Sequence, residues 1–280
     1  MLDKLILYFS AYPTLRYAAL AILLISVCSA LLGVSLVLKR YSMIGDGLSH
    51  VSFATAAIAA VLGLTTPIYV TLPLTVLAAV LILKLRGKKH AKGDSAIAMI
   101  SSGALALGYL ALNLFGDGVA EAQSDACATL FGSGILGIDL FDVILCLALS
   151  LFVIIIFVIF YNRIFAITFD EDFASAVGTR VDFYNTLSAV AVGITVVLAM
   201  NMLGALLASA LIIFPALSAM RLFKTFKSVT LCAVAISLFC AVVGVTISLL
   251  LATAIGPTVV VADLAVFIVC CVIGRIKQNN

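Results

Sequence analysis

Residues Leu140–Tyr161 read LFDVILCLALSLFVIIIFVIFY, and Asp142 carries the only charge in this run. A helix of about 20 apolar residues crosses the hydrocarbon layer of a bilayer, so the run predicts a transmembrane helix. The rest of the chain has the same character: 65% of its 280 residues are hydrophobic and 10% are charged. A soluble domain contains about 45–50% apolar and about 25% charged residues. The sequence therefore predicts an all-α integral membrane protein and excludes a soluble enzyme, a nucleic-acid-binding protein and a disordered protein.

The chain contains nine runs long and apolar enough to be transmembrane spans, with eight or ten as the nearest alternatives. The second run begins with the polar stretch 45–50, which is either helical or partly unwound or re-entrant. The sixth and seventh are short and separated only by residues 201–203, so they form either two spans or one bent, broken hairpin. The nine predicted spans are Tyr17–Leu38, Ile44–Leu64, Ile68–Leu85, Ser95–Phe115, Leu140–Tyr161, Tyr184–Met200, Gly204–Met220, Val229–Leu251 and Thr258–Gly274.

The distribution of basic residues sets the orientation of these spans, because cytoplasmic loops carry an excess of Lys and Arg. With the N-terminus outside and the C-terminus in the cytoplasm, all but Lys4 and Arg16 of the 16 basic residues fall inside. The loop after the fourth span carries Asp117, Glu121 and Asp125, as an outer loop can, and Met1–Tyr12 is an expected interfacial segment. The sequence thus predicts a multi-pass protein of the cell membrane. The basic residues predicted to lie on the cytoplasmic side are Lys39, Arg40, Lys84, Arg86, Lys88, Lys89, Lys92, Arg163, Arg180, Arg221, Lys224, Lys227, Arg275 and Lys277.

The spans follow one another without a soluble domain, so we expect a single transmembrane domain over residues 1–280. We expect no cleavable signal peptide, because the first run is too long and lacks a small-residue exit. No GxxxxGK[ST] motif occurs, so the chain does not hydrolyse ATP through a P-loop. The seven Cys lie mostly within apolar runs and form no CxxC, which predicts small buried residues rather than a disulfide framework or a zinc site.

Ionisable side chains within spans are costly and usually functional, and Asp46 and His50 form the most informative pair. Their i, i+4 spacing places both on one face of a helix. A carboxylate with an imidazole is a common ligand pair for Zn(II), Mn(II) or Fe(II). Two ligands are too few for a closed site, so a second copy of the chain or water would have to complete it. The structural alternative is an Asp–His hydrogen bond, or an N-cap by Asp46 for a helix that begins at Gly47.

The other candidate charges favour structural interpretations. Asp142 and Asp263 lie near the outer ends of the fifth and ninth spans, so we expect their carboxylates to reach the outer headgroups. His90 lies among basic residues between the third and fourth spans and is predicted to be a solvated cytoplasmic turn residue. Pro215 lies within the seventh span, among small residues that favour close helix packing, and is predicted to kink that helix.

The inner loop 169–180 is predicted to contain a short amphipathic helix. Three acids, residues 170–172, open it and suit the positive end of the helix dipole. Phe173, Ala174 and Val177 form an apolar stripe, and Gly178 ends the helix. The segment is either an ordinary juxtamembrane helix or a docking helix that inserts Phe173 into a groove of a cytoplasmic partner.

Several of these motifs together resemble the membrane permeases of zinc, manganese and iron ABC importers, the ABC-3 family. Residues 38–50, LKRYSMIGDGLSH, resemble the family's signature, with Gly47 where Ala is usual. The segment 170–178 is similar to the family's coupling helix, and 212–216, IIFPA, is similar to its Leu-Ile-Ile-Pro-Ala segment. Residues 256–261, GPTVVV, are similar to the opening of its last span.

The resemblance implies a permease like those of type II ABC importers, paired with a second permease copy around a two-fold axis. It also implies two cytoplasmic ATP-binding subunits, which hydrolyse the ATP, and an extracytoplasmic metal-binding protein. Asp46 and His50 would contribute a metal site on the permeation path, with the transported ion as cargo and no permanently bound cofactor. The residues implied in coupling to the ATPase are Asp170, Glu171, Phe173, Ala174, Val177 and Gly178.

Two other functions are compatible with parts of the sequence. A proton-coupled secondary transporter could use Asp46 and His50 as a proton relay, although it would not need the docking-like inner helix. An intramembrane aspartyl protease could pair Asp46 with Asp263, but it requires a Gly-x-Gly-Asp motif, and Met43 replaces the first glycine. The transporter therefore remains an alternative, and the protease does not.

Overall fold

The computed structural model describes residues 13–64, 68–85, 93–115, 140–251 and 253–279. Within these ranges the regular structure is helical throughout, with nine long helices and two short ones. The helices are α2 (Pro13–Leu38), α3 (Ile44–Val61), α4 (Ile68–Leu85), α5 (Gly93–Phe115), α7 (Leu140–Ile159), α8 (Tyr161–Phe169), α9 (Glu171–Ala176), α10 (Val181–Leu203), α11 (Ala205–Leu222), α12 (Phe226–Leu251) and α13 (Ile255–Asn279).

The nine long helices correspond one to one with the nine predicted spans. Eight helices within the described ranges are long and apolar enough to cross a membrane. Helix α4 is also apolar and has 18 residues, as many as α3 and α11. Large apolar side chains cover the outside of the bundle, as lipid contact requires; examples are Leu107, Leu147 and Val158. The prediction of an all-α multi-pass membrane protein is confirmed.

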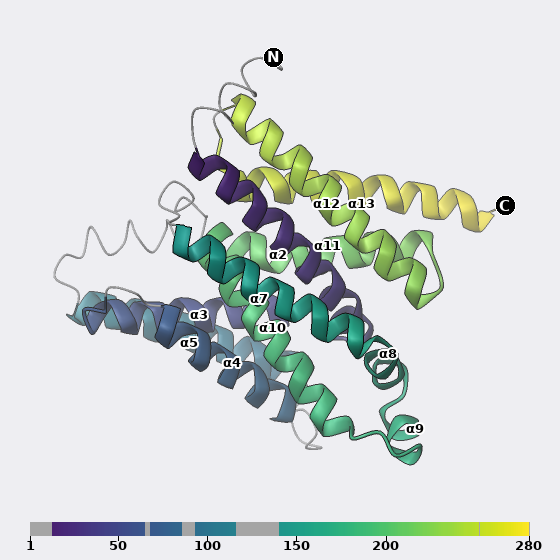
Figure 1. Ribbon diagram of the computed structural model, residues 1–280, viewed down its shortest axis with the longest axis horizontal. Helices are drawn as coiled ribbons and strands as arrows, with labels where there is room; N and C mark the ends of the chain where they lie inside the picture. The colour runs from purple at the N-terminus through teal and green to yellow at the C-terminus, as the bar shows by residue number, and fades with distance from the viewer. Residues whose placement is uncertain (1–12, 65–67, 86–92, 116–139, 252, 280) are drawn as a thin grey trace.

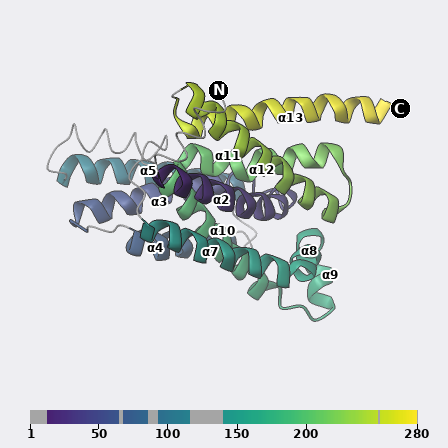
Figure 2. The same ribbon diagram turned by 45° about the horizontal axis from the view of Figure 1, so that its top comes forward.

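Helix α2 lies inside the bundle and contacts α7, α10, α11 and α12 (Figures 1 and 2). Its Ile22 and Ile25 are fully buried, as are Leu207 and Leu211 of α11. Glycines permit close packing elsewhere: a Cβ on Gly244 of α12 would lie 2.5 Å from Cγ2 of Val259 in α13. Small residues at such seams let helix backbones approach, which is a main source of helix association in membranes.

The sixth and seventh predicted spans are two separate helices joined by a single residue. Gly204 lies between α10 and α11 with φ 92° and ψ 158°, a backbone conformation open mainly to glycine. Its N–H donates to Met200 O, and its carbonyl accepts from Ala208 N, so the junction is hydrogen-bonded on both sides. Helix α11 continues past Pro215 to Leu222, and α4 likewise contains Pro73, which the sequence reasoning overlooked.

One end of the bundle gathers many basic residues predicted to be cytoplasmic, and we call it the basic end. Lys39, at the end of α2, bonds to Glu171 of α9, and the ammonium of Lys277 lies 5.9 Å from the ring of Phe223. Phe226, which begins α12, packs against aromatic rings of α8. This gathering agrees with the predicted orientation. His90, Met1–Tyr12 and the acidic residues of the loop after α5 lie outside the described residues.

Candidate metal site

Helix α3 carries the Asp46–His50 pair and is continuous from Ile44, so the stretch 45–50 is helical rather than unwound. The main chain begins this helix without side-chain help: Tyr41 O accepts from Ile44 N, and Met43 O accepts from Gly47 N. Met43 is the N-cap residue, and Asp46 lies within the first turn. Asp46 therefore does not cap a helix that begins at Gly47, and that alternative is wrong.

The carboxylate and the imidazole face each other across one helical turn. Asp46 Oδ1 lies 3.6 Å from His50 Nε2, which is too long for a hydrogen bond. Two atoms that each bind one ion at about 2.1 Å lie about 3.4 Å apart in tetrahedral geometry. The side chains are 48% and 22% exposed respectively, and among the described residues the buried His50 Nδ1 has no hydrogen-bond partner. The pair thus has the spacing of two ligands of one ion.

Two glycines fix the direction in which the pair points. A Cβ on Gly45 would lie 3.4 Å from the Cα of Ser209 in α11, and a Cβ on Gly47 would lie 2.6 Å from Cγ2 of Ile97 in α5. Successive helical residues are about 100° apart. Asp46 and His50 therefore project between the sides of α3 that touch α11 and α5.

Asp263 does not lie where the sequence placed it. Its side chain is 1% exposed, both of its oxygens are buried, and neither has a hydrogen-bond partner among the described residues. Helix α13 begins at Ile255, three residues earlier than predicted, and Asp263 lies two turns inside it, facing Cys240 of α12. The expectation that this carboxylate reaches the headgroups is wrong. Asp142 is half-buried in the first turn of α7.

The predicted coupling segment 169–180 contains the six-residue helix α9, whose residues divide into inward and outward sets. The Asp170 carboxylate accepts from Phe173 N at 2.9 Å and caps the helix, while Ala174 is buried. Phe173 and Val177 are 65% and 64% exposed, and Gly178 ends the turn with φ 85°. Most of the surface of this outward apolar pair is exposed, as on a docking surface.

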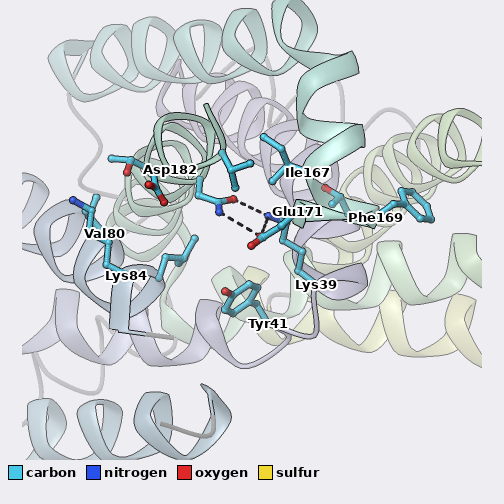
Figure 3. Close-up of a pocket in the computed structure, with 13 residues that line it drawn as sticks. Lys39, Tyr41, Val80, Lys84, Ile167, Phe169, Glu171 and Asp182 are labelled. Atoms are coloured by element: carbon cyan, nitrogen blue, oxygen red, sulfur yellow. Dashed lines mark hydrogen bonds and ion pairs between the residues drawn. The ribbon is translucent and has the colours of Figure 1, made fainter. Parts of the chain in front are cut away.

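Sequence reasoning missed a polar cluster beside α9. Glu171 Oε1 accepts from Lys39 Nζ at 2.8 Å and from Asn185 Nδ2 at 3.3 Å, and Lys39 also donates to Asn185 Oδ1 at 2.8 Å. The cluster borders a cavity of about 460 Å³ that Lys84 and Asp182 also line (Figure 3). From the sequence, Lys39 was placed only among the basic residues on the cytoplasmic side. Its position at the end of α2 was the one feature of the sequence that could have pointed to this cluster.

An all-helical bundle of transmembrane length, with an ionisable pair on one of its spans, is typical of membrane transport proteins. The sequence profile of the ABC 3 transport family matches residues 11–274, and the chain belongs to this family. It is therefore a permease, the transport subunit of the metal ABC-importer family, as its resemblance had suggested.

Relatives and solved structures cover nearly the whole chain. The manganese import system permease protein ScaB of Streptococcus gordonii is 27% identical, over 96% of this chain and 94% of its own length. A probable iron transport system membrane protein of Haemophilus influenzae is 30% identical, over 96% and 93%. The structure of PsaBC from Streptococcus pneumoniae in complex with Fab superimposes with a TM-score of 0.83 at 27% identity, over 96% and 95%.

Proposed function

We propose that this chain is the permease of an ATP-driven importer that moves a divalent transition-metal ion, Zn, Mn or Fe. Asp46 and His50 are its metal ligands, and the ion is cargo rather than a resident cofactor. The observation that carries the proposal is the 3.6 Å separation of Asp46 Oδ1 and His50 Nε2, which suits two ligands of one ion and does not suit a hydrogen bond. The names of the relatives, which mention manganese and iron, support this cargo class.

The site needs more ligands than one chain supplies. Transition-metal ions take four or more ligands, and each chain offers one carboxylate and one imidazole. Asp46 is half-exposed in the single chain, which is costly within a membrane unless a partner covers it. A second permease copy related by a two-fold axis would supply another pair and enclose the ion.

Energy enters at the basic end. The exposed pair Phe173 and Val177 would dock into a groove of a cytoplasmic ATP-binding subunit. Closure of the two ATP-binding subunits would then move α9 and, through it, the spans. An extracytoplasmic binding protein would deliver the ion to the opposite end.

The decisive experiment measures ATP-dependent uptake of Mn²⁺, Fe²⁺ and Zn²⁺ into proteoliposomes, normalised to folded complex. His50→Ala and Asp46→Asn should each abolish uptake while the amount of folded complex stays unchanged. The amide keeps the shape of Asp46 but loses the charge that offsets the ion in a low-dielectric path. Asp182→Asn, which removes an exposed acid from the first turn of α10, is the matched control and should transport normally.

Two results would contradict the proposal. Normal flux per folded His50→Ala complex would remove the imidazole from the transport path. Metal uptake that continues without any ATP-binding subunit would instead identify a proton-coupled secondary transporter with Asp46 and His50 as its relay.

A further inference from the structure

The basic end contains a direct polar connection between α9 and the helix that precedes the metal pair. Lys39 Nζ lies 2.8 Å from both Glu171 Oε1 and Asn185 Oδ1, and its side chain is only 15% exposed (Figure 3). A partly buried ammonium needs such partners, and the charge-assisted bonds give the contact a defined geometry. The end of α2 is thus joined to α9 and to the start of α10.

The chain between Lys39 and the metal pair is short and internally hydrogen-bonded. Arg40 N donates to Val37 O, Tyr41 N donates to Leu36 O, and Arg40 has φ 61°. These bonds form a Schellman motif, in which the residue after the helix takes the left-handed conformation. Ile44 N then donates to Tyr41 O, and helix α3 begins at once. Lys39 is therefore joined to Asp46 by a hydrogen-bonded turn and the first turn of α3, without a flexible loop between them.

Glu171 therefore has a different task from the outward residues of its helix. Phe173 and Val177 point away from the bundle, whereas the Glu171 carboxylate turns toward α2 and α10. The Glu171 carboxylate thus joins α9 to Lys39, and the tight turn joins Lys39 to the first turn of α3.

We propose that Lys39 is a positioning residue that transmits the displacement of α9 to Asp46 and His50 through its contact with Glu171. The inference rests on the proposed transport function and adds a route within this chain. When the Lys39–Glu171 contact is lost, ATP hydrolysis continues, but fewer metal ions are transported for each ATP hydrolysed. The side chain acts through α3 and does not touch the ion.

The test compares metal ions transported per ATP hydrolysed in proteoliposomes containing the complete complex. Lys39→Met and Glu171→Gln should each lower this ratio about fivefold or more, in the range of measured coupling effects. The double variant should be no worse than Lys39→Met alone, because Lys39→Met already removes the contact that Glu171→Gln weakens. Lys84→Met removes another lysine of the same cavity and should keep the wild-type ratio.

Unchanged ratios in Lys39→Met and Glu171→Gln would overturn the proposal, as would a double variant whose loss equals the product of the two single losses. Glu171 is half-exposed, so its variant tests the contact even if Lys39→Met does not fold. Wild-type complex that takes up no divalent metal would instead refute the proposed function.

If the wild-type complex takes up no divalent metal, the connection between α9 and α3 can still be tested. An environment-sensitive fluorophore on Leu62→Cys, at the exposed far end of α3, reports movement of α3 without a transported ion. ATP binding should shift its emission in otherwise wild-type complex and not in Lys39→Met. An equal shift in both complexes would overturn the transmission role.

Discussion

Gly33 of α2 and Ile212 of α11 pack backbone to backbone, so closely that a Cβ on Gly33 would overlap the main-chain oxygen of Ile212. A Cβ on Gly45 of α3 would lie 3.1 Å from Cδ1 of the same Ile212. One residue of α11 therefore sets the separation of α2 and α3, the two helices on either side of the turn that leads to the metal pair.

Gly33→Ala should destabilise the folded permease, because backbone atoms rather than a flexible side chain must move. Overpacking of this kind costs about 1–3 kcal/mol. Thermal unfolding followed by fluorescence size-exclusion chromatography would measure the loss. Gly103→Ala is the matched control: among the described residues, no atom beyond the adjacent part of its own helix lies within 4 Å of the added Cβ. Alanine also favours helix, so stability should hold or rise. Equal stability of the two variants would contradict the close contact.

Phe173→Ala should weaken copurification of the ATP-binding subunit without affecting insertion of the permease. A buried aromatic anchor at an interface contributes about 2 kcal/mol or more, which corresponds to a loss of affinity of about 30-fold. Phe239→Ala on α12 removes a ring that is comparably exposed, at 60%, but lies on a membrane span, and it should leave binding intact. If both variants retain the ATP-binding subunit equally, α9 is an ordinary juxtamembrane helix.

Arg40→Gly should preserve or increase thermal stability, because Arg40 has φ 61°, where glycine avoids the steric cost of a side chain. Arg40→Val should lower it by about 1–2 kcal/mol, since a β-branched residue resists the left-handed region. Melting temperatures of the two variants would measure the difference. A glycine variant less stable than the valine variant would mean that the turn relies on the Arg40 side chain rather than on its backbone.

Asp263→Asn should raise or maintain stability, because the amide has nearly the shape of the buried carboxyl and never carries its charge. Asp142→Asn, at the N-terminal turn of α7, should instead lower stability by about 0.3–1 kcal/mol, since it removes a charge that favours the helix dipole. Parallel thermal melts would compare them. A marked loss in Asp263→Asn would show that the ionised carboxylate has a partner that holds it.

The spans were predictable because membrane insertion depends on the length and polarity of a local run. All nine predicted spans have a corresponding helix, and the 45–50 stretch is helical within the second of them. The i, i+4 relation of Asp46 and His50 was also predictable, since helix geometry alone places them on one side.

The remaining features depend on how helices face one another, which a single sequence does not encode locally. Asp263 is near the end of an apolar run, yet rotation of α13 against α12 buries it. Lys39 and Glu171 are 132 residues apart, so only the packing of α2 against the α8–α10 region brings them together. The sequence grouped Glu171 with the residues implied in coupling to the ATPase, because nothing in the local sequence identifies Lys39 as its partner.

The one-residue junction at Gly204 also limits how the protein can change during evolution. A residue inserted or deleted there that lengthens or shortens one of the two helices would rotate α11 by about 100° relative to α10. Such a rotation would turn Ile212 away from Gly33 and Gly45, so that the close packing of α11 against α2 and against α3 would be lost together. We expect homologous permeases to tolerate length changes in their surface loops and to reject them between the residues equivalent to Leu203 and Ala205.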